Sequence, residues 1–167
     1  GARYMLEPNV KEGKGGLRDL QTLYWLTKFL YGVSNVADLV PLGVFTTQDV
    51  NRFTKAQDFL WTVRCHLHYL AGRPEERLTF DVQKTISERM TYAEREGISG
   101  VERFMKHYFL IAKDVGDLTR VLCAVLEDQH KKRSLFRLPG LALLGTKVEG
   151  FQVDRGRISV DSEDAFR

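Results

Sequence analysis

A polar, glycine-rich segment, Leu6–Leu20, contains the residue types that bind phosphate groups. Its glycines come directly before a predicted helix, where backbone amides can approach an anion closely and the helix terminus adds partial positive charge. Basic side chains interleaved with the glycines can contact phosphate oxygens. The candidate phosphate-binding residues are Lys11, Gly13, Gly15, Gly16 and Arg18, with Lys14 as a further cation.

Two carboxylates of the same segment, Glu7 and Asp19, are candidate supporting groups that could hold a divalent metal or order these cations. The alternative is structural: the glycines let the chain turn into the helix, and Arg18 pairs with Asp19 on the surface. A charge at a helix end contributes only about 0.3–1 kcal/mol, whereas even millimolar binding requires about 4 kcal/mol. The segment would therefore need a second surface to hold a nucleotide tightly.

Three other patterns are similar to functional motifs but do not satisfy them. Gly140–Lys147 is similar to a P-loop, but its order Gly-Thr-Lys misplaces the lysine. Cys65, His66 and His68 lie close in sequence, but on a helix they do not share one face at the spacing of a zinc site. Cys65 and Cys123, in separate apolar helical stretches, predict buried free thiols rather than a disulfide. No catalytic residue and no metal site is predicted in this chain.

Four segments with apolar residues at helical spacing must position the glycine-rich segment. They are residues 17–31, 46–71, 80–90 and 100–128. Thr46 with Asp49, and Ser99 with Glu102, match the capping box that starts a helix. Gly32 is well placed to end the first helix.

Apolar side chains give the helix at 17–31 a wide face that is predicted to pack in the core: Leu17, Leu20, Leu23, Tyr24, Leu26, Phe29 and Leu30. The aromatic residues of the first two helices have helical spacing too, which favours core packing over stacking on nucleic-acid bases. They are Tyr24, Trp25, Phe29, Tyr31, Phe53, Phe59 and Trp61.

After Gln129 the pattern changes. Residues 129–140 contain a dense basic run, Lys131–Arg133, and are interpreted as a solvated linker. Residues 148–153 and 157–160 alternate in polarity around the turn at 154–156, which predicts a small β-hairpin. Ser162 before Glu163 and Asp164 resembles a helix start that the chain end cuts off, which favours a piece of a longer protein. The predicted fold is mainly α: a helical bundle at 17–128, with a β element and truncated helix at 141–167.

Composition restricts the class of protein. The 167 residues, 43% of them hydrophobic, are typical of one globular domain, alone or with a small appendage, and argue against disorder. No run approaches the roughly 18 apolar residues of a membrane span. The net charge of +3 is not gathered into a basic stripe, which argues against a nucleic-acid partner. The N-terminus resembles neither a signal nor a transit peptide, and a cytoplasmic location is predicted.

The segment Leu6–Gln21 resembles the bacterial bifunctional uridylyltransferase/uridylyl-removing enzymes that modify the PII nitrogen-signalling protein. The resemblance continues through Phe59–His68, Arg77–Gln83 and Val101–Tyr108, and through residues 135–160. It therefore covers essentially the whole chain, and its first motif is quite specific.

This resemblance implies a parent enzyme that transfers UMP from UTP to a tyrosine of PII, with magnesium, and removes it again. The family combines a nucleotidyltransferase domain, a helical domain, a metal-dependent hydrolase domain and ACT sensor domains. The chain resembles the helical domain, an antiparallel bundle of the nucleotidyltransferase-associated type, with residues 1–16 as the end of the transferase region. The transferase hallmark, Gly-Ser followed by Asp-x-Asp, and the His-Asp of the hydrolase are absent from the sequence. We therefore expect both metal sites to lie outside the chain, which would be inactive alone, with UTP, PII and other domains of the same polypeptide as partners.

The sequence leaves three alternatives open. The related adenylyltransferase of glutamine synthetase shares the glycine core, but usually continues Ile-Glu-Phe where this chain has Leu20-Gln21-Thr22. The chain could also be a structural spacer between catalytic domains, or a basic helical nucleic-acid binder.

Asn9 stands where relatives can carry aspartate, which argues against a metal-ligand role for this position.

Overall fold

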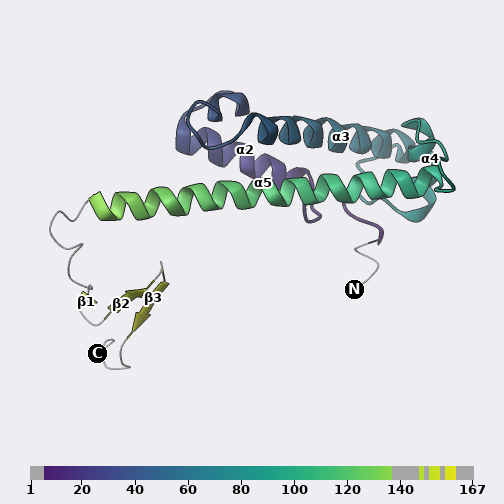
Figure 1. Ribbon diagram of the computed structural model, residues 1–167. Helices are drawn as coiled ribbons and strands as arrows, with labels where there is room; N and C mark the ends of the chain where they lie inside the picture. Colours follow the sequence, from purple (N-terminus) through teal and green to yellow (C-terminus); the bar gives the residue numbers. More distant parts are fainter. Residues whose placement is uncertain (1–5, 137–146, 149–150, 155–156, 161–167) are drawn as a thin grey trace. The chain divides into compact units, whose positions relative to one another are not determined.

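The computed structural model describes residues 6–136, 147–148, 151–154 and 157–160, and it is mainly helical, as predicted (Figure 1). Its helices are α2 (Leu17–Tyr31), the short 3-10 helix η1 (Val36–Leu39), α3 (Thr47–Ala71), α4 (Phe80–Arg89) and α5 (Gly100–Phe136). The chain divides into two compact units, residues 1–122 and 123–167. None of the helices within the described ranges has the length and hydropathy needed to cross a membrane.

Local capping signals fix the helix ends. Thr46 Oγ1 accepts a hydrogen bond from the Asp49 amide (3.1 Å), and Asp49 returns one by accepting from the Thr46 amide (2.9 Å). This reciprocal pair confirms the capping box predicted at the start of α3. Gly32 ends α2 in the left-handed conformation, with φ of 65°, where a residue without Cβ is favoured.

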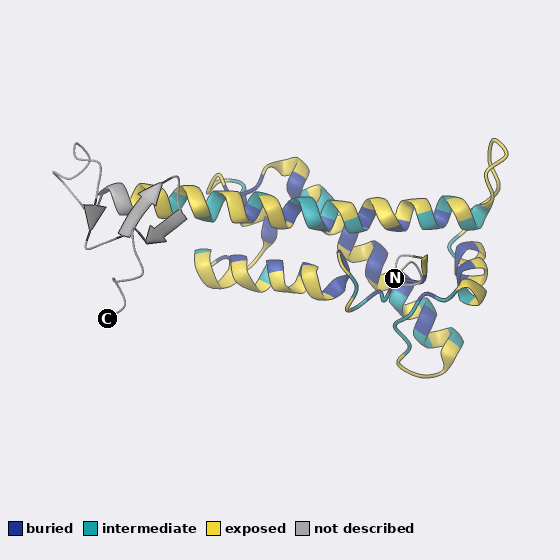
Figure 2. Cartoon of the chain, turned by 90° about the horizontal axis from the view of Figure 1, so that it is seen from below, coloured by how far each residue is buried: buried dark blue, intermediate teal, exposed yellow. Residues whose placement is uncertain are grey.

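Helices α3 and α5 pack against each other in opposite directions. Arg52 lies 3.8 Å from Asp114, whereas the ring of Phe59, further along α3, is 6.0 Å from the ring of Phe104, earlier in α5. Figure 2 shows buried and exposed residues alternating along the helices, as expected when one face of each helix lies in a core. The largest fully buried side chains include Leu17, Leu20, Leu39, Leu60, Leu67, Leu78, Ile86, Phe104, Leu118 and Leu122.

The apolar face predicted for α2 is wider than the face that packs. The buried positions follow a single line down the helix: Leu17, Leu20, Leu23 and Thr27. The side chains predicted to join them, Leu26, Phe29 and Leu30, are exposed, and so are Trp25 and Trp61. The core prediction was wrong for these residues, because the periodicity of apolar residues marks a wider face than the line of α2 that is buried in the structure.

Two further sequence-based expectations need correction. Helix α5, predicted to end near Asp128, continues to Phe136. No glycine or proline interrupts residues 117–138, and Lys132 pairs with Asp128 one turn earlier at 2.8 Å. The thiols of Cys65 and Cys123 are free, as predicted, but exposed rather than buried.

The second unit contains three short strands. Strand β1 (Lys147–Val148) pairs antiparallel with β2 (Phe151–Asp154), and β2 pairs antiparallel with β3 (Arg157–Val160). The turn predicted at 154–156 includes residues 155–156, which lie outside the described residues, as does the helix start predicted at Ser162. The hairpin and the domain boundaries therefore stay predictions.

Candidate functional site

The candidate site is residues 7–19, named here the glycine loop, and Asn9 shapes its first turn. The Asn9 side-chain oxygen accepts hydrogen bonds from the amides of Lys11 (3.0 Å) and Glu12 (2.7 Å). The Asn9 carbonyl accepts a third from the amide of Gly13, at 2.8 Å. An asparagine or aspartate oxygen that binds amides two and three residues ahead stabilises a turn. The Asn9 oxygen is thus used within the loop.

The amides of the three glycines also donate within the chain. Gly13 donates to the Asn9 carbonyl and Gly16 to the Gly13 carbonyl, at 2.8 and 2.9 Å. Gly15 donates to the Asp19 carboxylate at 2.7 Å. An anion would have to displace these bonds to bind the glycine amides, so the loop's basic side chains are better placed to contact a phosphate.

Gly15 allows the loop to lie directly against α5. Its φ is +75°, in the left-handed region that residues with a Cβ rarely adopt. A Cβ built at this position would lie 2.4 Å from the carbonyl oxygen of Ala112 and 2.7 Å from its Cα. Both the backbone conformation and the close approach to α5 therefore require glycine here.

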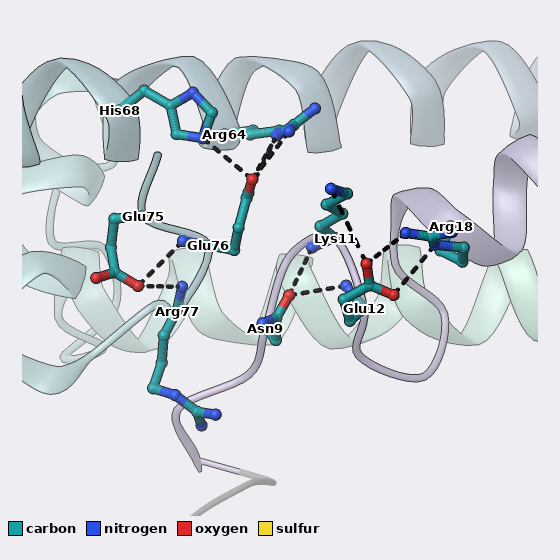
Figure 3. A network of polar contacts seen from close by, with 9 residues as sticks. All are labelled: Asn9, Lys11, Glu12, Arg18, Arg64, His68, Glu75, Glu76 and Arg77. Carbon is teal, nitrogen blue, oxygen red and sulfur yellow. Dashed lines mark hydrogen bonds and ion pairs between the residues drawn. The ribbon is translucent and has the colours of Figure 1, made fainter. Parts of the chain in front are cut away.

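Basic side chains surround one carboxylate at the edge of the loop. Arg18 donates two hydrogen bonds to Glu12, of 2.6 and 3.1 Å, and the Lys11 ammonium lies 4.0 Å from the same carboxylate (Figure 3). Arg18 and Glu12 are both about half exposed, and Lys14 is exposed. An exposed ion pair contributes only about 0–1 kcal/mol, so a phosphate group could replace Glu12 on Arg18 at small cost.

The two supporting carboxylates have structural partners. Glu7 is 4% exposed, and its Oε1 accepts a hydrogen bond from the Phe80 amide at 3.0 Å, at the first residue of α4. Asp19 binds the Gly15 amide rather than forming the predicted surface pair with Arg18, whose partner is Glu12. A carboxylate at a helix start interacts favourably with the helix dipole. Glu7 thus joins the glycine loop to α4.

Replacing Glu7 with alanine is expected to lower the free energy of unfolding by about 1–3 kcal/mol, because a hydrogen bond to a charged group is lost and a backbone donor loses its acceptor. Urea denaturation measures this loss. Glu12→Ala is the control, because Glu12 is exposed, and it should change stability by less than about 1 kcal/mol. Equal losses in both variants would contradict the role of Glu7.

Backbone hydrogen bonds attach the start of the loop to the segment before α4. The Val10 amide donates to the Glu76 carbonyl at 2.8 Å, and the Leu78 amide donates to the Pro8 carbonyl at 2.9 Å. These bonds join residues 66 and 70 positions apart in the sequence. The loop's position is therefore set by tertiary contacts as well as by its own turns.

Glu76 binds two side chains of α3 and lies next to the glycine loop (Figure 3). Arg64 donates to its carboxylate from Nε (3.0 Å) and from the guanidinium terminus (2.8 Å), and His68 Nε2 lies 3.2 Å away. Burial raises the pKa of the Glu76 carboxyl, but the hydrogen bonds and charge of Arg64, with His68, outweigh this, so the pKa lies below its ordinary value.

Sequence reasoning assigned no role to this Arg64–Glu76–His68 cluster. Arg64 and His68 are four residues apart on α3, a spacing that places them on one face of a helix. That spacing signals a shared partner, but the partner comes from an irregular segment whose path no local pattern predicts. Only the fold brings Glu76 to them.

The lowered pKa of Glu76 predicts a specific dependence of stability on pH. Because the folded pKa lies below the unfolded one, the contribution of Glu76 is fully present above its ordinary pKa of 4.5 and is lost as pH falls through the folded pKa. Glu76→Gln should therefore lower stability near neutral pH and flatten its decline below about pH 4.5. Denaturation curves between about pH 3 and 7 measure this, with Glu94→Gln, at an exposed position, as the control. An unchanged slope in Glu76→Gln would contradict it.

The structure does not bring Cys65, His66 and His68 together on a shared partner. Cys65 is exposed, His66 accepts from Arg89 at 3.0 Å, and His68 contacts Glu76. Burial, followed by the charge of Arg89, lowers the pKa of His66. Across the part of the chain that the structure describes, no group of three or more His, Cys, Asp or Glu side chains is placed to hold a metal ion.

Comparison with known proteins identifies close relatives of this chain. The family model described as GlnD PII-uridylyltransferase matches residues 1–123. The bifunctional uridylyltransferase/uridylyl-removing enzyme of Rhodospirillum rubrum is 57% identical over 166 residues, which are 99% of this chain and 18% of that protein. The same enzyme of Azospirillum brasilense is 57% identical over 98% of this chain and 18% of its own length.

A third relative with that name, from Bradyrhizobium sp. strain ORS 278, is 49% identical over 99% of this chain and 19% of its own length. The chain thus spans about a fifth of the length of the curated relatives it matches. No solved structure matches it.

Proposed function

The chain belongs to the GlnD PII-uridylyltransferase family, and from this we propose that it is the helical part of an enzyme that transfers UMP from UTP to a tyrosine of the PII signal protein and removes it again. The observation that supports this most strongly is the identity of 49–57% over 98–99% of the chain with enzymes named for both activities. The relatives favour this function over the adenylylation of glutamine synthetase.

Within this enzyme the chain supports nucleotide or PII binding and is inactive alone. The side chains of Lys11, Lys14 and Arg18 contact phosphate oxygens of UTP, and Arg18 exchanges Glu12 for the phosphate. Gly13, Gly15 and Gly16 shape the loop that presents these cations, rather than donating their amides to the ligand. The exposure of the Arg18–Glu12 pair supports this exchange.

Magnesium, when bound with UTP in the parent enzyme, would neutralise charge on the triphosphate. The carboxylates of Glu7 and Asp19 already accept backbone hydrogen bonds, so they are better suited to holding the loop than to holding that metal. The metal ligands therefore belong to other domains of the same polypeptide, which act together with this chain in the cytoplasm. The antiparallel bundle associated with nucleotidyltransferases and the small C-terminal β-hairpin are part of the same proposal.

The experiment that tests this function is transfer of labelled UMP from UTP to purified PII. The full-length polypeptide should label PII, and the 167-residue chain at the same concentration should not. Release of UMP from labelled PII is then measured with both proteins. Failure of the full-length polypeptide to transfer UMP would refute the function, and labelling by the chain alone would refute its inactivity.

A purely structural role is the second candidate, and one observation favours it. The glycine amides donate within the chain, and Gly15 packs on α5, as expected of a loop that only connects elements. The two roles differ in what they predict for Arg18. If the loop is only a scaffold, replacing Arg18 leaves UMP transfer unchanged. If Arg18 contacts a phosphate, replacing it lowers UMP transfer.

A further inference from the structure

The second half of α2 exposes large apolar side chains on the side away from its buried residues. Phe29 is 86% exposed and Trp25 62% exposed, and Leu26 and Leu30 are also exposed. These four residues, named here the α2 outer face, lie at positions i, i+1, i+4 and i+5, which fall together on one side of a helix. A soluble helix normally carries polar residues there.

The α2 outer face continues toward the glycine loop. Arg18, Thr22, Trp25 and Phe29 are spaced four, three and four residues apart, so they follow one stripe along the helix. The stripe is polar at its start and apolar at its end. Arg18 and Phe29 are eleven residues apart, or about 16 Å at a rise of about 1.5 Å per residue. A single partner could therefore cover Phe29 and approach Arg18.

The size of this face indicates what kind of partner covers it. Four large side chains present on the order of 500 Å² of apolar surface, which on a monomer commonly marks an interaction site. A stable complex of separate proteins buries about 800 Å² on each partner. A tethered partner needs less contact, because the linker holds it at an effective concentration of about millimolar. The relatives are about five times as long as this chain, so tethered partners are available.

We propose that the α2 outer face is the docking surface for another part of the same polypeptide, outside these 167 residues, and that docking places Arg18 at the edge of the interface. The occupant presents apolar side chains opposite Trp25 and Phe29. A cation also borders the face, since Lys28 Nζ lies 5.3 Å from the centre of the Trp25 ring. We identify this occupant as the part of the polypeptide that carries the transferase centre. That identity rests on the proposed function, whereas the docking itself does not. Docking would supply the second surface that the loop needs to hold a nucleotide.

Photo-crosslinking in the full-length polypeptide tests this docking. A benzophenone amino acid replaces Phe29 in one variant and Leu110, an exposed apolar residue of α5, in the control. The proposal expects an intramolecular crosslink from position 29, independent of protein concentration, to a peptide outside residues 1–167. A crosslink to residues 137–167, to a second copy, or only to added PII would overturn it. A yield at position 29 no higher than at position 110 would overturn it as well.

Substitution of Phe29 measures the consequence for activity. Phe29→Asp in the full-length polypeptide should lower UMP transfer by about tenfold or more, as for loss of a central interface residue, whereas Leu110→Asp, outside the α2 outer face, should leave transfer within about twofold. Equal transfer in Phe29→Asp and Leu110→Asp would overturn a contribution of docking to transfer. If the position 29 variant gives the crosslink but the unsubstituted polypeptide transfers no UMP, the proposed function is refuted and the docking stands. If UMP transfer depends on Arg18 but no crosslink forms from position 29, the docking is refuted and the proposed function stands.

Discussion

Replacing Gly15 with alanine is expected to lower the free energy of unfolding by about 2–5 kcal/mol. Two independent costs contribute. A residue with a Cβ in the left-handed region costs about 1–2 kcal/mol, and the backbone shift needed to relieve overpacking costs about 1–3 kcal/mol. The contact to be relieved is severe, because the new Cβ would lie 2.4 Å from a backbone oxygen of α5, and a backbone atom cannot move aside as a flexible side chain can.

Gly32 provides a matched control for this prediction. Its φ of +65° is as unusual as that of Gly15, but no atom lies within 4 Å of the position that a Cβ would take. Gly32→Ala should therefore show only the conformational cost of about 1–2 kcal/mol. Thermal unfolding distinguishes the variants, since 1 kcal/mol corresponds to about 2–4 °C in Tm for a protein of this size. Equal shifts in the two variants would contradict the packing of the loop on α5.

Much of the helical fold can be predicted from local sequence because its signals are local. Helix α2 spans the predicted residues 17–31, and α3 begins at the predicted capping box of Thr46 and Asp49. These features depend on residues within one turn of each other. The end of α5 was predicted too early because a basic, polar run was interpreted as a linker, although nothing in residues 129–136 breaks a helix.

Features that depend on tertiary contacts could not be predicted in the same way. Periodicity indicates that α2 has an apolar face, but not that Phe29 and Leu30 lie outside the packed part of it. The bond from the Phe80 amide to Glu7 joins residues 73 positions apart. The glycine loop was recognised by composition, which cannot show whether glycine amides are free for a ligand or donate within the loop. That distinction required the fold.

The second large effect is expected on activity rather than stability. Arg18→Ala in the full-length polypeptide should lower the rate of UMP transfer by about 10–100-fold, because a hydrogen-bonded contact with a charged group contributes about 1.5–3 kcal/mol and 1.4 kcal/mol corresponds to tenfold. Folding should be preserved, since the lost Arg18–Glu12 pair is exposed. Arg95→Ala is the matched control, because Arg95 is also an exposed arginine beside a neighbouring glutamate, Glu96.

The most direct test of the glycine loop's role measures two activities of the same Arg18→Ala protein: transfer of UMP to PII and removal of UMP from modified PII. Unfolding curves first establish that the variant is folded. The account predicts that transfer falls by about 10–100-fold while removal stays at the level of the Arg95→Ala control. Unchanged transfer in the folded variant would contradict the phosphate contact and leave the glycine loop with a structural role alone.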